Sequence, residues 1–82
     1  MIREVDLHSH DYIQASLKIQ DELENAFYSD ITELKFCHGS NRGTVIRDYI
    51  RKGKMQKEAS PEISSSIQIV PDGPSYTTIK FS

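Results

Sequence analysis

The chain is 82 residues long, which is enough for one small hydrophobic core and too short for a second. Hydrophobic residues make up 37% of it, with four tyrosines and three phenylalanines, and this composition excludes a disordered tail. We therefore expect a single folded domain over residues 1–82. Large barrels and doubly wound enzymes are excluded by length.

The chain contains one cysteine, Cys37, so no internal disulfide can form. Its place in an apolar run is typical of a buried thiol in a reducing compartment. No apolar stretch reaches the about 20 residues that cross a bilayer, and the first residues do not resemble a signal peptide. We expect a cytoplasmic protein that does not bind membranes.

The formal net charge is -2, but the two signs are separated along the chain. Residues 1–33 contain eight acidic and two basic residues, whereas residues 42–57 contain six basic residues and one acidic residue. Such a basic block can present a positive face to phosphate, although charge runs are more often solvated surface. Nucleic acid is therefore a candidate partner.

The first half of the chain predicts a strand, a helix and a second strand. Residues 2–7 form a short strand, and Asp11 followed by Gln14 predicts a capping box that opens a helix reaching about Tyr28. Residues 34–37 form the second strand. The helix is expected to bury Ile13, Leu17, Leu23 and Phe27 and to expose Lys18, Asp21, Glu22 and Asn25.

The second half begins with a glycine-containing loop at residues 38–43. A second helix is expected to start at Gly43 or Thr44 and to stop at Gly53, a residue that adopts the left-handed conformation easily. Residues 54–64 are polar and predict a mobile connection. Residues 65–70 and 77–81 alternate as strands around a turn at residues 71–75. Further buried residues are expected to be Val45, Ile46 and Phe81.

This order predicts an α/β two-layer sandwich with the topology βαβαββ. A mixed four-stranded sheet, in which the first three strands run parallel, would pack against two helices. Ligands bind beyond the carboxyl ends of parallel strands, so His8 and His38 are expected at one edge of the sheet.

Asp6, His8 and His10 alternate at the end of the first strand, a spacing that can bring three side chains to one side. Metal sites use this spacing, but the chain has only one further histidine, and we predict no tight multinuclear metal site. A carboxylate beside an imidazole fixes its tautomer and raises its basicity, as proton transfer in phosphodiester cleavage requires. The alternative is structural, with His8 bonded to backbone and Asp6 accepting from loop amides.

The loop at residues 38–47 runs into the start of a helix, where free amides and the positive end of the helix dipole attract an anion. Nearby arginines add bidentate donors. Any strand-to-helix turn favours Gly, Ser and Asn, so a purely structural loop is the alternative. The predicted phosphate-binding residues are Gly39, Ser40, Asn41, Arg42, Gly43, Arg47, Arg51 and Lys52.

Several segments of the chain form a recognisable set: Val5-Asp6-Leu7-His8, the capped helix with Ala15 and Leu17, His38-Gly39, Gly43-Thr44-Val45-Ile46-Arg47 and, loosely, Gly73-Pro74-Ser75-Tyr76-Thr77-Thr78. Together they resemble the small MutS-related (Smr) domain family, and the resemblance covers nearly the whole chain. In that family an Asp-Leu-His motif closes the first strand, a His-Gly-x-Gly or Thr-Gly-x-Gly loop follows the second, and a helix with a Leu/Ile-Arg pair comes next. Here Asn41 stands at the loop's second glycine, and Ser9 replaces the glycine that usually follows Asp-Leu-His.

The resemblance implies a nucleic-acid-binding domain with endonuclease activity on DNA or RNA. Asp6 would orient His8, either His8 or His38 would move the proton, and Arg47 with the loop amides would hold the phosphate. RNA would supply its own 2′-hydroxyl as nucleophile, whereas DNA would need an activated water and a divalent ion such as Mg²⁺ near Asp6. The alternatives are a non-catalytic nucleic-acid-binding module and a protein-interaction domain that uses an edge strand or the acidic first helix.

Overall fold

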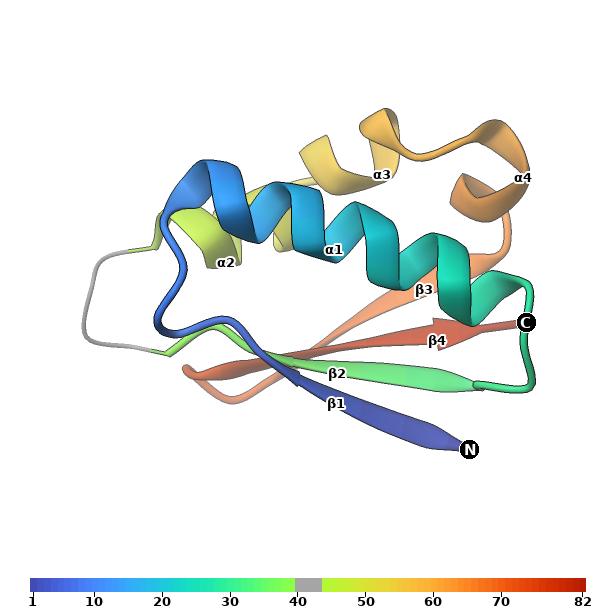
Figure 1. The fold of residues 1–82 in the computed structure, drawn as a ribbon, viewed down its shortest axis with the longest axis horizontal. Helices are drawn as coiled ribbons and strands as arrows, with labels where there is room; N and C mark the ends of the chain where they lie inside the picture. Colours follow the sequence, from blue (N-terminus) through green and yellow to red (C-terminus); the bar gives the residue numbers. More distant parts are fainter. Residues whose placement is uncertain (40–43) are drawn as a thin grey trace.

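The computed structural model describes residues 1–39 and 44–82. Within them the chain forms two layers, with the helices together on one face of a four-stranded sheet (Figure 1). The expected α/β sandwich with a mixed sheet is confirmed. In chain order the elements are β1 (Ile2–Asp6), α1 (Tyr12–Phe27), β2 (Glu33–Cys37), α2 (Val45–Arg51), α3 (Lys54–Glu58), α4 (Pro61–Ser64), β3 (Ile67–Asp72) and β4 (Tyr76–Phe81).

The strands lie in the order β1-β2-β4-β3. β1 pairs with β2 in parallel, and β4 runs antiparallel to both of its neighbours, β2 and β3. The first three strands of the chain therefore point the same way, as expected, and α1 makes the crossover between β1 and β2. This arrangement brings the carboxyl ends of β1 and β2 next to the beginning of β4.

Helix α1 begins at a capping box that the sequence predicts. The Asp11 carboxylate accepts from the Gln14 backbone amide at 2.8 Å, and the Gln14 side chain accepts from the Asp11 amide at 3.2 Å. These two bonds satisfy amides that the first turn leaves without an intrahelical partner. The helix then runs to Phe27, within one residue of the expected end.

The buried face of α1 differs from the expected one. Ile13 and Leu17 are each 68% exposed, so their predicted burial is wrong. The buried stripe instead contains two alanines, which allow the helix to approach the sheet closely, and it shares only Leu23 with the expected set. Phe27 packs half-buried against the core. The buried residues of α1 are Ala15, Ile19, Glu22, Leu23 and Ala26.

Glu22 is buried, although its charge predicts a solvent position. Its carboxylate is paired with Arg3 Nε at 2.7 Å and with Lys18 Nζ at 3.0 Å. These cations lower the pKa of Glu22, with the Arg3 hydrogen bond as the largest cause. The pairing satisfies the buried charge and links α1 to β1.

Helix α2 starts at Val45 and is followed by Gly53 with φ of 91°, as expected for a left-handed stop. Val45 is 57% exposed, so its predicted burial is wrong. Ile46 and Phe81 are half-buried against the core. The buried residues of α2 are Tyr49 and Ile50.

Residues 54–64 form two short helices, α3 and α4, and the prediction of a mobile connection there is wrong. Met55 and Ile63 are buried and attach these helices to the core. Ser60 caps α4 by accepting from the Ile63 amide, and Pro61 occupies the first turn. A Ser-Pro pair of this kind is typical of the start of a helix, but the prediction for residues 54–64 rested on their polar composition instead.

The core between the layers is made of large apolar side chains from both. Cys37 is only half-buried, in contrast to the expected burial of its thiol. Among the described residues, no helix has the length and apolar character needed to cross a membrane. The largest fully buried hydrophobic side chains are Leu7, Ile19, Leu23, Leu34, Phe36, Ile50, Met55 and Ile79.

Candidate functional site

The candidate site lies at the sheet edge where β1 and β2 end and β4 begins (Figure 1). The Leu7 amide donates to the Cys37 carbonyl at 2.7 Å, which extends the pairing of β1 and β2 beyond Asp6. On the other side, the His38 amide donates to the Ser75 carbonyl at 2.9 Å. Three segments far apart in sequence therefore meet at one edge, as the topology predicts.

Gly39 brings the segments after β1 and β2 into close approach. Its φ is 75°, a conformation that favours glycine, and a Cβ built there would lie 3.7 Å from the Cβ of His8. The Gly39 amide also donates to the Ser75 carbonyl at 3.2 Å. The structure thus gathers Asp6, His8, His38 and Gly39 of the predicted site residues.

Asp6 and His8 form a hydrogen-bonded pair on the surface. Asp6 Oδ1 accepts from the His8 backbone amide at 3.0 Å and from His8 Nδ1 at 2.5 Å. The side-chain bond from His8 is the main cause that lowers the pKa of Asp6, and the backbone bond adds to it. The His8 side chain is 65% exposed, and its Nε2 makes no hydrogen bond to any residue described.

His38 is buried and satisfied by the protein itself. Its Nδ1 donates to the Gly39 carbonyl at 3.0 Å, and its Nε2 lies 2.9 Å from Thr77 Oγ1. Burial lowers the pKa of His38, and the positive charges of Arg51 and Arg47 lower it further, while the bond to Gly39 opposes them. The ring is therefore held neutral, with both nitrogens engaged.

Arg51 anchors the end of α2 to the β3–β4 turn. Its Nε donates to Thr77 Oγ1 at 2.8 Å, and its Nη2 donates to the carbonyls of Gly73 at 2.6 Å and Tyr76 at 2.8 Å. These bonds use three of the five guanidinium donors and leave Nη1 without a partner among the described residues. Thr77, near the start of β4, joins this arrangement, although it is not among the site residues predicted from the sequence.

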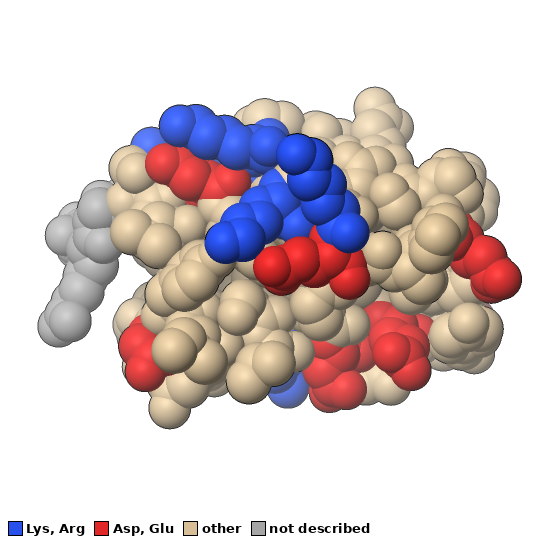
Figure 2. Space-filling model, turned by 90° about the horizontal axis from the view of Figure 1, so that it is seen from above, with Lys and Arg blue, Asp and Glu red and all other residues tan. Residues whose placement is uncertain are grey.

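Of the predicted phosphate-binding residues that the structure describes, Arg47 and Lys52 have charged groups with only distant partners. Arg47 Nε lies 3.9 Å and Lys52 Nζ 3.7 Å from the Asp48 carboxylate, and such loose surface pairs contribute little. On the helical face, lysine and arginine side chains gather in a cluster that acidic side chains interrupt (Figure 2). The predicted residues Ser40, Asn41, Arg42 and Gly43 lie outside the part of the chain that the structure describes.

The described residues contain no group of three or more His, Cys, Asp or Glu side chains arranged to hold a metal ion. His10, which shares the alternating spacing with Asp6 and His8, is half-buried, and its Nδ1 has no partner among those residues. Two carboxylates lie at the strand ends of this edge: Asp6 is engaged by His8, and Asp72, at the end of β3, is paired with Lys35 Nζ at 3.3 Å. This donor set fits proton transfer better than a Mg²⁺ site, which takes several oxygen ligands.

The fold is similar to that of a domain whose crystal structure is known. The crystal structure of the Smr domain of Thermus thermophilus MutS2 is similar over 98% of this chain and 98% of its own, with a TM-score of 0.69 and 24% sequence identity. No family model and no curated protein matches the sequence. The likeness spans nearly the whole of both chains, and the chain has the fold of the Smr domain.

Proposed function

We propose that this chain is a nucleic-acid-binding domain that cleaves a phosphodiester bond, with His8 as its proton-transferring group. The observation that carries the proposal is the surface pair of Asp6 and His8, in which one ring nitrogen is fixed and the other faces solvent. The resemblance to the Smr family, several members of which are endonucleases, supports the same activity.

The Asp6–His8 pair suits general base catalysis on RNA. In the proposed step the 2′-hydroxyl oxygen bonds to the adjacent phosphorus while its proton passes to His8 Nε2. The P–O5′ bond breaks, a 2′,3′-cyclic phosphate forms, and the leaving 5′-oxygen takes a proton from water. Asp6 holds Nδ1–H and stabilises the imidazolium that forms. RNA is the favoured substrate because its nucleophile is internal, so the chemistry needs no group beyond those at the edge.

We assign proton transfer to His8 and a supporting role to His38. Both nitrogens of His38 are occupied, by Gly39 and by Thr77, and its side chain is buried. A proton carrier needs a nitrogen within reach of substrate, which only His8 offers of the two. His38 instead fixes the Gly39 carbonyl and keeps that backbone against His8.

Phosphate binding is assigned to Arg47 and Lys52, together with Gly39 and the residues Ser40, Asn41, Arg42 and Gly43 that the sequence pattern indicates. Arg47 lies near enough to His38 to lower its pKa, so its charge acts at the site. Arg51 contributes charge there too, but most of its donors hold the turn. Affinity that rests on such contacts falls steeply with salt.

The test is a cleavage assay with labelled single-stranded RNA, duplex DNA and a branched DNA, each with and without EDTA. We expect RNA to be cut in the presence of EDTA, and His8→Ala to lose about 100 to 10,000-fold in rate while binding stays nearly unchanged. His10→Ala is the matched control, because it removes a histidine of the same segment that the proposed step does not use.

Three results would contradict the proposal or part of it. Binding without cleavage of any substrate would leave a non-catalytic binding module. Cleavage that survives His8→Ala and vanishes in His38→Ala would move the proton transfer to His38. Cleavage of DNA that EDTA abolishes would replace the metal-free mechanism.

A further inference from the structure

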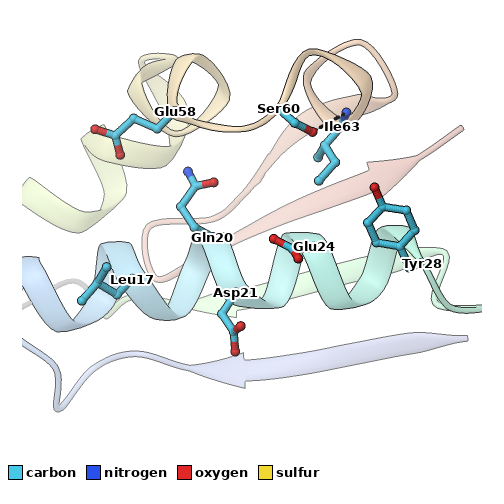
Figure 3. Close-up of a pocket in the computed structure, with 8 residues that line it drawn as sticks. All are labelled: Leu17, Gln20, Asp21, Glu24, Tyr28, Glu58, Ser60 and Ile63. Carbon is cyan, nitrogen blue, oxygen red and sulfur yellow. Dashed lines mark hydrogen bonds between the residues drawn. The ribbon is translucent and has the colours of Figure 1, made fainter.

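We infer that the groove between α1 and the α3–α4 segment is a docking site for a basic, amphipathic segment of another protein. Figure 3 shows Gln20 and Glu24 rising from α1 toward the opposite wall, with Leu17 and Tyr28 toward the two ends. The inference does not depend on the proposed nuclease activity. The lining residues are Leu17, Gln20, Asp21 and Glu24 from α1, Tyr28 directly after it, and Glu58, Ser60 and Ile63 from the other wall.

The groove is flanked by large hydrophobic side chains that the fold does not bury. Leu17 is 68% and Tyr28 is 71% exposed, and Ile13, one turn before Leu17, is 68% exposed. These residues follow helical spacing along one stripe, so Leu17 and Tyr28 are about 16 Å apart along the axis at 1.5 Å per residue. Aligned exposed apolar side chains of this kind are typical of a binding surface.

The groove is also negatively charged. Asp21 and Glu24 form no ion pair with any residue that the structure describes. Glu58 accepts from the Tyr49 hydroxyl at 2.6 Å and interacts with the charge of Lys54 on α3, so Asp21 and Glu24 are the uncompensated carboxylates of the lining. The one lysine near this stretch of α1, Lys18, is paired with the buried Glu22 at 3.0 Å. The lining carboxylates therefore attract lysine and arginine side chains and repel the phosphates of a nucleic acid.

Hydrogen bonds fix the wall opposite α1 before any partner binds. Gln20 Nε2 donates to the Tyr49 hydroxyl and to the Met55 carbonyl, both at 2.9 Å, and the Tyr49 hydroxyl donates to Glu58. Ile63 is buried below the rim. A groove that is ordered in advance binds at a lower entropy cost than one that must form on binding.

The occupant that fits these features is a helix with apolar anchors on one face and lysines or arginines beside them. Its anchors would contact Leu17 and Tyr28, and its cations would lie near Asp21 and Glu24, which is the helix-in-groove mode of recognition. The segments that line this groove, the later part of α1 and the α3–α4 segment, lie in the helical layer, away from the strand ends of the candidate site (Figure 1). A protein partner and a nucleic acid can therefore bind at the same time.

The test is an NMR titration of ¹⁵N-labelled protein with a synthetic amphipathic helix of leucine and lysine, and with a matched peptide carrying glutamate in place of lysine. We expect saturable shift changes at Leu17, Glu24, Tyr28 and Ser60 with the lysine peptide only. Asp21→Lys with Glu24→Lys should weaken binding at least about three- to tenfold, as the reversal of two surface charge pairs implies. Glu4→Lys, a single reversal of the same kind on β1, should not.

A second double variant separates the apolar contribution from charge. Leu17→Ser with Tyr28→Ser should weaken binding and leave the melting curve unchanged, because both side chains are exposed. The inference is overturned if the NMR signals show no saturable shift up to about 1 mM peptide, or if the shifts map to another surface. The same holds if Glu4→Lys weakens peptide binding as much as Asp21→Lys with Glu24→Lys does. It is also overturned if the groove resonances shift with protein concentration alone, since the occupant is then a second copy of the chain.

Discussion

The hydroxyl of Thr77 lies 2.9 Å from Nε2 of His38 and donates its proton to that nitrogen. The direction follows from the neighbours, because the same oxygen accepts from Arg51 Nε at 2.8 Å, while His38 Nδ1 must donate to the Gly39 carbonyl. One hydrogen-bonded chain thus links α2, the start of β4 and the end of β2. It holds the backbone at Gly39 beside His8.

The first prediction concerns this chain of bonds. Thr77→Val keeps the shape but removes the hydroxyl, so it should raise the pKa of His38 and cost about 1 to 3 kcal/mol of stability, because buried polar groups lose their partner. Thr77→Ser keeps the hydroxyl and should leave the pKa low. The measurement is an NMR titration of the His38 ring in each variant. An unchanged His38 pKa in Thr77→Val would mean that the threonine does not hold the tautomer.

The second prediction is a pH dependence of stability. The folded pKa of His38 is below its unfolded value of about 6.5, so folding favours the neutral ring. Its contribution is complete above about pH 6.5 and is lost as the pH falls toward the folded pKa. Urea unfolding at pH 7.5 and pH 5 should show less stability at the lower pH. His38→Gln should reduce this loss, and an equal loss in that variant would assign it to other groups.

The third prediction separates the two sides of α1. Leu23 is fully buried, and Leu23→Ala should cost about 2 to 5 kcal/mol through the cavity it leaves. Leu17→Ala, at an exposed position, should change stability by no more than about 0.5 kcal/mol. Denaturation curves of the two variants make the comparison. A large loss in Leu17→Ala would mean that α1 is rotated relative to the structure.

The fourth prediction distinguishes two arginines of α2. Arg51→Ala should lower the melting temperature, because the turn at Gly73 and Tyr76 loses its donor. Arg47→Ala should leave the melting temperature nearly unchanged and weaken nucleic-acid binding, with a salt slope smaller by about one. If both variants stay fully folded and weaken nucleic-acid binding equally, Arg51 belongs to the binding surface as well.

The helices show where sequence patterns are sufficient and where they are not. The capping box at Asp11 and the stop at Gly53 are local, since each depends on residues within a few positions, and both are confirmed. The buried face of α1 is wrong in the sequence-based prediction because large apolar residues suggest burial more strongly than alanine does. Packing against the sheet instead buries the stripe that contains Ala15 and Ala26, and Leu17 stays exposed to solvent.

The sequence by itself determined the order of the strands and of α1 and α2, the mixed sheet and the pairing of Asp6 with His8, whereas it did not show α3 and α4. That pair is two residues apart at a strand end, so the backbone alone brings the carboxylate to the imidazole. The distinct roles of the two histidines required the tertiary structure. Thr77 is 39 residues from His38 and 26 from Arg51, and only the pairing of β4 with β2 and the packing of α2 bring them within hydrogen-bond distance. Burial and those contacts, which no local pattern encodes, leave His38 neutral and His8 open to solvent.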